Sequence, residues 1–315
     1  MKLSEAVDEL LIATSAAGRS DRTVRDYAEK AACLVDYLGD KEIDQLTAGD
    51  LRRFVEGLRQ RTSRFEKHPN RETLSGGLSP ASVAAYVRVV RRLFSFLVEE
   101  ELLDKNPAHR LKAPRTARGK PKAISQPDLQ KLLESTDIAT VVGKRDRALI
   151  LLLADSGCRV GGLVRIDVDD VDLERCRVIL REKGEKVRYG FFSEPTKHAI
   201  QDWLEVRPND KGTRLFVSLG TRGDAHLTEQ GVREKLRRLK KKSGVKGPVN
   251  PHSFRHGFAR EYLTNGGNLA SLADTMGHSD VHVTWQSYSI FTIDELKAAH
   301  ERYSPVAHLE RDGLL

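Results

Sequence analysis

Hydrophobic residues among the first hundred positions recur every three or four residues, which is the spacing of amphipathic helices. Four helices are therefore predicted there. Each is marked by a residue that favours a helix start, in chain order Ser4, Asp21, Thr47 and Ser79. The last signal is strong because Ser79 precedes a proline, and proline at the first helical position gives up an amide that would have no helical partner. Between the third and fourth helices, residues 61–77 are predicted to form a polar, basic loop.

The helical periodicity stops at residues 113–121, which read APRTARGKP. Two prolines and a glycine disfavour regular structure, and the other residues are small or basic. We therefore predict three parts: a helical domain over residues 1–112, an exposed basic linker over 113–122 and a second domain over 123–315.

The second domain mixes helical and alternating hydrophobic patterns. Helices are predicted to start at Ser125, to cover residues 145–156 up to a glycine, and to cover residues 232–242. Two runs with strand character, at residues 177–180 and 187–192, flank the tight turn EKGEK. The predicted fold class is mainly α with a small antiparallel β-sheet (α+β).

The composition is that of a globular protein, with 39% apolar and 31% charged residues in a chain of 315. Three cysteines without a C-x-x-C pair fit the reduced thiols of a cytoplasmic protein and argue against a disulfide framework or a zinc finger. No segment approaches the roughly 20 apolar residues of a membrane helix, and the N-terminus lacks the apolar core of a secretory signal. We therefore expect a cytoplasmic protein that does not enter a membrane.

Lysine and arginine outnumber aspartate and glutamate by 53 to 45, which gives a formal net charge of +8. The basic residues are spread over both predicted domains, as expected of a chain that contacts a polyanion along its length. A solvated, soluble surface explains the same charge equally well. Charge alone does not decide between the two.

Four short segments of the second domain carry residues suited to phosphoryl chemistry. In chain order they read SGCRVGGL, EKGEK, PHSFRHGFA and MGHSDVHVTWQSYS. Taken singly, each has an ordinary explanation, such as a salt bridge, a solvated turn or a packed aromatic ring. Their candidate catalytic residues are Arg159, Lys183, His252, Arg255, His278 and Tyr288.

In this order and spacing the segments resemble the tyrosine recombinases, the phage-integrase family of site-specific recombinases. The resemblance covers nearly the whole chain: a helical N-terminal domain, a basic linker, an arginine box, a lysine hairpin, an H-x-x-R box, a G-H box and a downstream tyrosine. It implies a helical core-binding domain followed by a recombinase catalytic domain. It also implies an activity that cuts and rejoins duplex DNA through a 3′-phosphotyrosyl intermediate.

Two features depart from the family's usual pattern. Many members carry an acidic residue three positions after the first arginine, where this chain has Gly162. Many also place the tyrosine nine positions after the histidine of the G-H box, whereas Tyr288 lies ten positions after His278. The first departure leaves open what supports Arg159, and neither removes a reacting group.

Three of these residues are suited to hold a phosphate. Arg159 and Arg255 stay protonated and can grip the non-bridging oxygens with planar, bidentate donors. His278 can supply a further hydrogen bond. Fixed donors aimed at developing charge are usually the largest catalytic contribution.

The other three are suited to the bond changes. Tyr288 can attack phosphorus and form a covalent intermediate. Lys183 can protonate the departing 5′ oxygen, and His252 can accept the proton of the tyrosine. This scheme requires neither a metal nor another cofactor.

A zinc site is the alternative for two of the histidines, because His252 and His256 are four residues apart on a predicted helix. A zinc protease would have glutamate after the first histidine, where this chain has Ser253. Arg255 would also bring positive charge close to the ion. We therefore expect no metal and a structural role for His256.

The resemblance implies that both domains clamp double-stranded DNA at a specific recombination site, and that four copies of the chain act together as a homo-tetramer on nucleoid DNA. Two other functions stay open at this point: a type IB topoisomerase, which acts as a monomer on unspecific duplex, and a DNA-binding relative without catalytic activity. The DNA contacts expected in the first domain are Arg22, Arg25, Arg88, Arg91 and Arg92.

Overall fold

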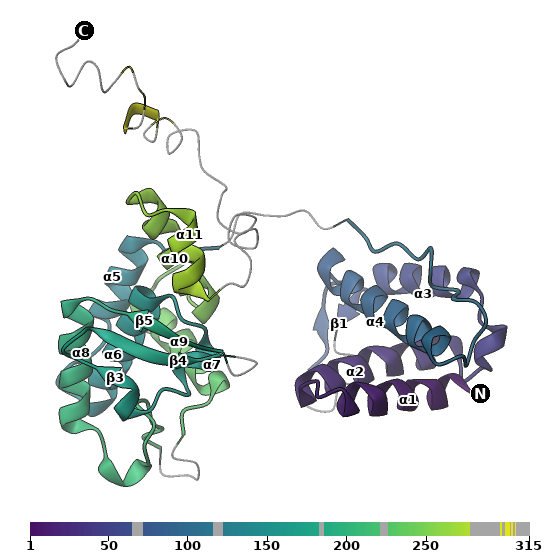
Figure 1. Ribbon diagram of the computed structural model, residues 1–315, viewed down its shortest axis with the longest axis horizontal. Coiled ribbons are helices and arrows are strands. Elements are labelled where there is room, and N and C mark those ends of the chain that lie inside the picture. Colours follow the sequence, from purple (N-terminus) through teal and green to yellow (C-terminus); the bar gives the residue numbers. More distant parts are fainter. Residues whose placement is uncertain are drawn as a thin grey trace. The chain divides into compact units, whose positions relative to one another are not determined.

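The computed structural model describes residues 1–64, 72–115, 122–182, 186–220 and 226–277, together with 297, 300–302, 304 and 306. The chain forms two compact units, Met1–Arg118 and Gly119–Leu315 (Figure 1). The division falls within residues 113–122, the segment predicted as a linker.

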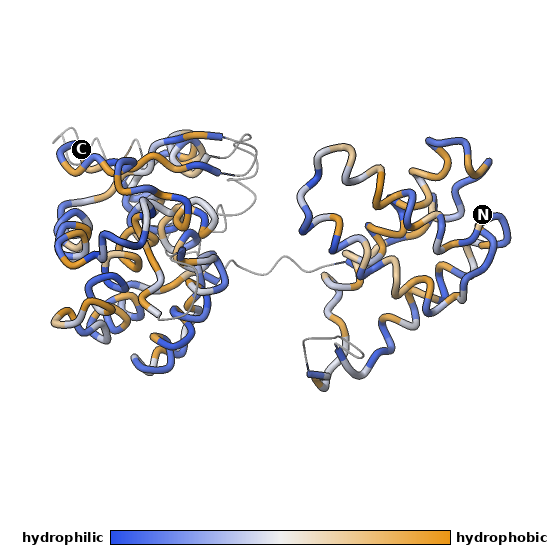
Figure 2. Tube along the Cα trace, turned by 90° about the horizontal axis from the view of Figure 1, so that it is seen from below, coloured by the Kyte–Doolittle hydropathy of each residue, from blue (hydrophilic) through white to orange (hydrophobic). Residues whose placement is uncertain are grey.

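The first unit is built from helices. Its elements are α1 (Leu3–Ala16), α2 (Asp21–Leu38), the short helix η1 (Ile43–Gln45), α3 (Ala48–Gln60), β1 (Ser63–Arg64), β2 (Leu74–Ser75) and α4 (Pro80–Glu99). Helix α2 packs against α1, α3 and α4. These contacts bury large apolar side chains, including Leu10, Leu34, Phe54 and Leu93. Figure 2 shows the corresponding alternation of hydrophobic and hydrophilic residues along the helices.

Three of the four predicted helix starts in this unit are confirmed. The second helix begins at Asp21, and Thr47 and Ser79 cap the next two by accepting the amides of the residues three positions on. The expectation for Ser4 is wrong: α1 begins at Leu3, and Ser4 instead donates its amide and hydroxyl to Asp40 at 2.9 and 3.0 Å. The predicted loop contains the two paired strands β1 and β2, which were not expected.

The second unit combines helices with a small sheet. Its helices are α5 (Gln126–Glu134), α6 (Val141–Ser156), α7 (Val160–Leu163), α8 (Glu194–Val206), α9 (Glu229–Ser243), α10 (Pro251–Thr264), α11 (Leu269–Met276) and the short η2 (Val168–Asp170) and η3 (Asn209–Lys211). Its strands β3 (Val171–Asp172), β4 (Arg177–Arg181) and β5 (Val187–Phe191) form one antiparallel sheet in that order. Helix α6 packs against α8, α10 and β5.

The sequence patterns of this unit agree closely with the structure. Ser125 caps α5, accepting the amide of Asp128 at 3.2 Å. Helix α6 ends before Gly157 as predicted, but it starts at Val141, because Thr140 accepts the amide of the residue three positions on at 3.0 Å. The predicted fold class, mainly α with a small antiparallel sheet, is confirmed. Among the described helices, none combines the length and the apolar composition needed to cross a membrane.

Gly157 shapes the turn that leads to the candidate site. Its φ of +57° lies in the left-handed region, where side chains other than that of glycine are strained. A Cβ added there would lie 2.5 Å from Cδ1 of Phe258, which is too close for any side chain. The glycine therefore allows α6 to end against α10, two residues before Arg159.

Candidate active site

Arg255 joins three segments of the second unit through one buried guanidinium. It lies on α10 with 4% of its surface exposed. Its Nη1 donates to the carbonyl oxygen of Gly157 and its Nη2 to that of Met276, both at 2.7 Å. A buried charge is tolerated only when it has such partners. Arg255 therefore fixes the end of α6 and the end of α11 against α10.

His252 lies in the first turn of the same helix. The helix begins there because the side chain of Asn250 accepts the amide of Ser253 at 3.1 Å, and Pro251 occupies the first helical position. His252 is exposed. It lies at the helix end whose amides favour negative charge, a location that suits the approach of a phosphate.

His256 lies one turn further along α10 and is half-buried. Burial lowers the pKa of His256 from its ordinary value, and electrostatic interaction with the neighbouring His252 and Arg255 lowers it further. The ring is therefore neutral near pH 7. Within the described part of the chain, no three side chains of His, Cys, Asp or Glu come together as a metal site.

Arg159 lies directly before α7, in the turn that Arg255 fixes. Its Nη1 forms an ion pair with Oε2 of Glu182, the residue that follows β4. The Glu182 side chain is 7% exposed, whereas that of Arg159 is 39% exposed. A guanidinium that reaches the surface is thus held by a buried carboxylate.

Arg188, on β5, is a second partner of the same carboxylate. Its Nε and Nη2 donate to Oε1 of Glu182 at 3.1 and 3.0 Å, and its Nη1 donates to the carbonyl of Thr275 at 2.5 Å. Burial lowers the pKa of Arg188 from its ordinary value, but an arginine remains charged at neutral pH. Glu182 and Arg188 therefore connect Arg159 with the end of α11.

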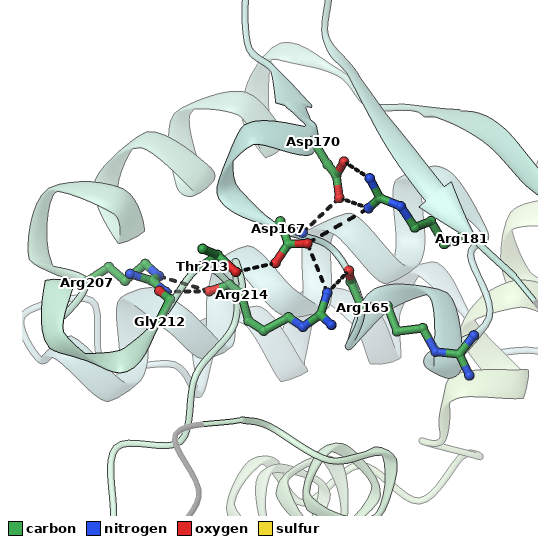
Figure 3. A network of polar contacts seen from close by, with 8 residues as sticks. All are labelled: Arg165, Asp167, Asp170, Arg181, Arg207, Gly212, Thr213 and Arg214. Atoms are coloured by element: carbon green, nitrogen blue, oxygen red, sulfur yellow. Dashed lines mark hydrogen bonds and ion pairs between the residues drawn. The ribbon is translucent and has the colours of Figure 1, made fainter.

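A polar network anchors the end of β4 beside this site (Figure 3). Asp170 accepts hydrogen bonds from both terminal nitrogens of Arg181, the last residue of the strand, and from the amide of Asp167 at 2.9 Å. Asp167 in turn accepts from Arg214 at 3.0 Å and from Thr213 at 2.8 Å. Burial by itself would raise the pKa of Asp170, but the hydrogen bonds from Arg181 and the Asp167 amide, with the charges of Arg181 and Arg214, hold it below its usual range.

The structure describes three of the six predicted catalytic residues and brings their segments together. Lys183, His278 and Tyr288 lie outside the described residues, so their roles stay predictions. Two of them lie next to residues of the site in the sequence: Lys183 directly follows Glu182, and His278 comes two residues after Met276, whose carbonyl accepts from Arg255.

The five arginines predicted to contact DNA in the first unit are all exposed, on α2 and α4. Two of them also have contacts on their own helix: Nε of Arg25 donates to the carbonyl of Asp21 at 3.3 Å, and Arg92 pairs with Glu99 at 2.8 Å. Exposure is compatible with a DNA contact and with a solvated surface alike. The role of Arg22, Arg25, Arg88, Arg91 and Arg92 stays a prediction.

The described geometry unites an arginine box, an H-x-x-R helix and the end of the helix before the G-H box. Residues 122–292, more than half of the chain, match the phage integrase family. The chain belongs to this family, that of the tyrosine recombinases. The predicted family is thereby confirmed.

Known relatives of this recombinase agree with the assignment. The chain is 33% identical to the tyrosine recombinase XerD of Listeria innocua over 235 residues, which are 73% of this chain and 78% of that protein. It is 30% identical to the tyrosine recombinase XerC of Oceanobacillus iheyensis over 297 residues, which are 92% of each chain. The recombinase is thus an enzyme of site-specific DNA recombination, as predicted, and these relatives lend no support to the topoisomerase alternative.

Solved structures show the same fold. The Tn1549 transposon integrase in complex with a circular intermediate DNA matches with a TM-score of 0.75 at 19% identity, covering 96% of this recombinase and 100% of that chain. The XerH site-specific recombinase bound to its difH substrate matches with a TM-score of 0.66 at 18% identity, covering 93% and 82%.

Sequence reasoning missed two residues of the site, Glu182 and Arg188. Within EKGEK, Glu182 is adjacent to a lysine, which suggests a solvated turn or a salt bridge to that neighbour. One signal was available: Gly162 provides no acid three residues after Arg159, so another carboxylate had to be sought.

Proposed function

We propose that the recombinase cuts one strand of duplex DNA at a time, with Tyr288 as the nucleophile. The tyrosine oxygen attacks phosphorus, a 3′-phosphotyrosyl bond forms, and the bond to the 5′ oxygen breaks. A 5′ hydroxyl from the partner strand then attacks the phosphotyrosyl bond and releases the tyrosine. One phosphoester replaces another in each step, so the reaction requires no ATP.

The observation that carries this proposal is the pair of carbonyl bonds made by Arg255. They join the turn before Arg159 and the helix end before His278 to the helix that carries His252. In the proposed reaction the two arginines grip the non-bridging oxygens, whose charge grows in the transition state. His278 adds a hydrogen bond to the same phosphate.

Two groups move the protons. His252, exposed in the first turn of α10, accepts the proton of Tyr288 as the tyrosine attacks. Lys183 gives a proton to the departing 5′ oxygen. The same two groups exchange these tasks when the strand is resealed.

We infer further that both units bind double-stranded DNA at a specific site, with residues 1–112 as a core-binding domain, 123–315 as the catalytic domain and a tetramer as the synaptic form. Structural relatives support DNA binding and the association of copies: one is an integrase with circular intermediate DNA, and another is a lambda integrase dimer bound to a core site. The protein would act in the cytoplasm on nucleoid DNA. The proposed phosphate contacts of the first unit are Arg22, Arg25, Arg88, Arg91 and Arg92.

Mapping protein–DNA adducts tests the function directly. The recombinase is incubated with genomic DNA of its own organism, quenched with detergent, and the covalently bound fragments are sequenced. We expect adducts at one or a few sites. Adducts spread over unrelated sequences would favour the topoisomerase, and the absence of adducts would favour a non-catalytic DNA-binding protein.

Lys183→Ala tests the general acid. A leaving 5′ oxygen requires a proton, whereas a 5′ sulfur at the same bridging position departs readily without one. We expect Lys183→Ala to cleave ordinary DNA at least about 100-fold more slowly than wild type and to be largely rescued on the bridging-sulfur substrate. The measurement is the single-turnover rate of adduct formation on both substrates.

Lys186→Ala is the matched control, because Lys186 is the other lysine of the same turn. If Lys186→Ala is rescued by sulfur and Lys183→Ala is not, the general acid is Lys186. If neither variant is rescued, the proton comes from another group, and His252 is the first to be tested.

A further inference from the structure

Glu182 is a buried carboxylate shared by two arginines. Its side chain is 7% exposed; Oε2 pairs with Arg159, and Oε1 accepts from Nε and Nη2 of Arg188 at 3.1 and 3.0 Å. A buried carboxylate is costly unless it is paired and hydrogen-bonded. Its location between two guanidinium groups therefore reflects a specific arrangement rather than a solvated turn.

Gly162, in α7, lies next to Glu182. Gly162 lies in this short helix, three residues after Arg159. A Cβ added at Gly162 would lie 4.0 Å from Cγ of Glu182 and 3.9 Å from the carbonyl oxygen of Arg181, both ordinary contact distances. A side chain at position 162 would thus meet the side chain of Glu182. Position 162 and the side chain of Glu182 are therefore neighbours in space, and the carboxylate beside Arg159 comes from Glu182.

The backbone around Glu182 is fixed on both sides. Its amide donates to the carbonyl of Lys186 at 2.9 Å, closing the base of the hairpin. The preceding residue, Arg181, is held by Asp170 in the network of Figure 3. Arg181, the last residue of β4, and Glu182, the residue after it, contact different partners: Arg181 pairs with Asp170, and Glu182 pairs with Arg159 and Arg188. The glutamate can therefore hold Arg159 in one orientation.

We propose that Glu182 is the positioning residue for Arg159, supplying from the position directly after β4 the carboxylate that Gly162 cannot provide. It orients the guanidinium toward the scissile phosphate. Through Arg188, which donates to the carbonyl of Thr275, it also ties Arg159 to the segment before His278. This inference rests on the proposed function, in which Arg159 grips the phosphate during attack by the tyrosine.

Glu182→Gln tests the charge of the side chain while keeping its shape. We expect adduct formation on a nicked substrate to slow by at least about 10-fold, with DNA affinity within about threefold of wild type. The rate is measured in single turnover and the affinity by fluorescence anisotropy. The matched control is Asp172→Asn, because Asp172 also pairs with two arginines, Arg175 and Arg177, outside the site. The control should keep the wild-type rate.

A double-mutant cycle separates positioning from general stability. If Glu182 acts through Arg159, then Glu182→Gln should slow an Arg159→Ala enzyme by no more than about twofold, because the group it positions is already absent. Equal slowing in both backgrounds would overturn the inference. So would a Glu182→Gln enzyme that keeps the wild-type rate.

Moving the carboxylate provides the second test. The single variant Glu182→Gly should form adducts slowly. The double variant, Glu182→Gly with Gly162→Glu, should regain most of the lost rate of adduct formation, because its new side chain enters the volume that Glu182 vacates. Thermal unfolding checks that each variant is folded. If Glu182→Gln proves unfolded, the comparison of Glu182→Gly with the double variant decides. A folded double variant that forms adducts no faster than Glu182→Gly contradicts the inference. If the wild-type enzyme forms no adduct, the proposed function is contradicted, and the inference that rests on it fails as well.

Discussion

Tyr288→Phe is expected to abolish covalent protein–DNA adducts on a nicked suicide substrate, while DNA affinity stays within about threefold of wild type. Phenylalanine keeps the ring but lacks the oxygen that attacks phosphorus. Tyr288 is chosen because it follows the G-H box at recombinase-like spacing. The substrate carries the site found by adduct mapping, and adducts are resolved on denaturing gels and identified by mass spectrometry of the linked peptide.

Tyr262→Phe is the control for this experiment. Tyr262 lies on α10, the helix that carries His252 and Arg255, and its hydroxyl contacts Oγ of Ser271 at 3.2 Å. The variant loses a tyrosine hydroxyl but should form adducts at nearly the wild-type rate. Adducts that persist in Tyr288→Phe, or that map to Tyr262 or Tyr303, would show that another residue is the nucleophile.

The helix boundaries that could be predicted depend on local interactions. Thr47, Ser79 and Ser125 each accept an amide only three residues away, so the signal lies within one turn of sequence. Ser4 offered the same chemistry, but its amide and hydroxyl go to Asp40, 36 residues further along the chain. A tertiary partner outside the local window decided that helix start, and sequence patterning could not reveal it.

In the candidate site, too, features that depend on local sequence could be predicted, whereas features that depend on distant partners could not. The residue types and spacing of the boxes made Arg159, His252 and Arg255 candidates, because phosphate chemistry restricts which side chains can serve. The sequence could not reveal that Arg255 is buried, since its partner Gly157 is 98 residues away. Glu182 was missed for a related reason, because its two arginine partners are brought together only by the packing of α7 against β4.

The two proposed phosphate-binding arginines should respond differently to substitution. Arg159→Ala and Arg255→Ala are each expected to slow adduct formation by about 100-fold or more, because each removes a donor to the charge that builds in the transition state. The side chain of Arg159 is 39% exposed, and its loss leaves Glu182 paired with Arg188, so it should lower the free energy of unfolding less than the loss of Arg255 does. Arg255 is 4% exposed and donates to two buried carbonyls. Its loss should therefore also lower the free energy of unfolding by about 3 kcal/mol.

Urea unfolding and single-turnover cleavage, measured on the same preparations, separate these effects. Arg255→Lys keeps the charge, but an ammonium group cannot donate to both Gly157 and Met276 as a planar guanidinium does. This variant should therefore also cleave DNA slowly and have a lower free energy of unfolding than wild type. Arg260→Ala, an exposed arginine of the same helix, should change the rate by no more than about threefold. If an Arg159→Ala enzyme cleaved at the wild-type rate and lost only DNA affinity, Arg159 would contact the DNA backbone without acting in catalysis. An Arg255→Ala enzyme as stable as wild type would contradict the structural role assigned to its two carbonyl bonds.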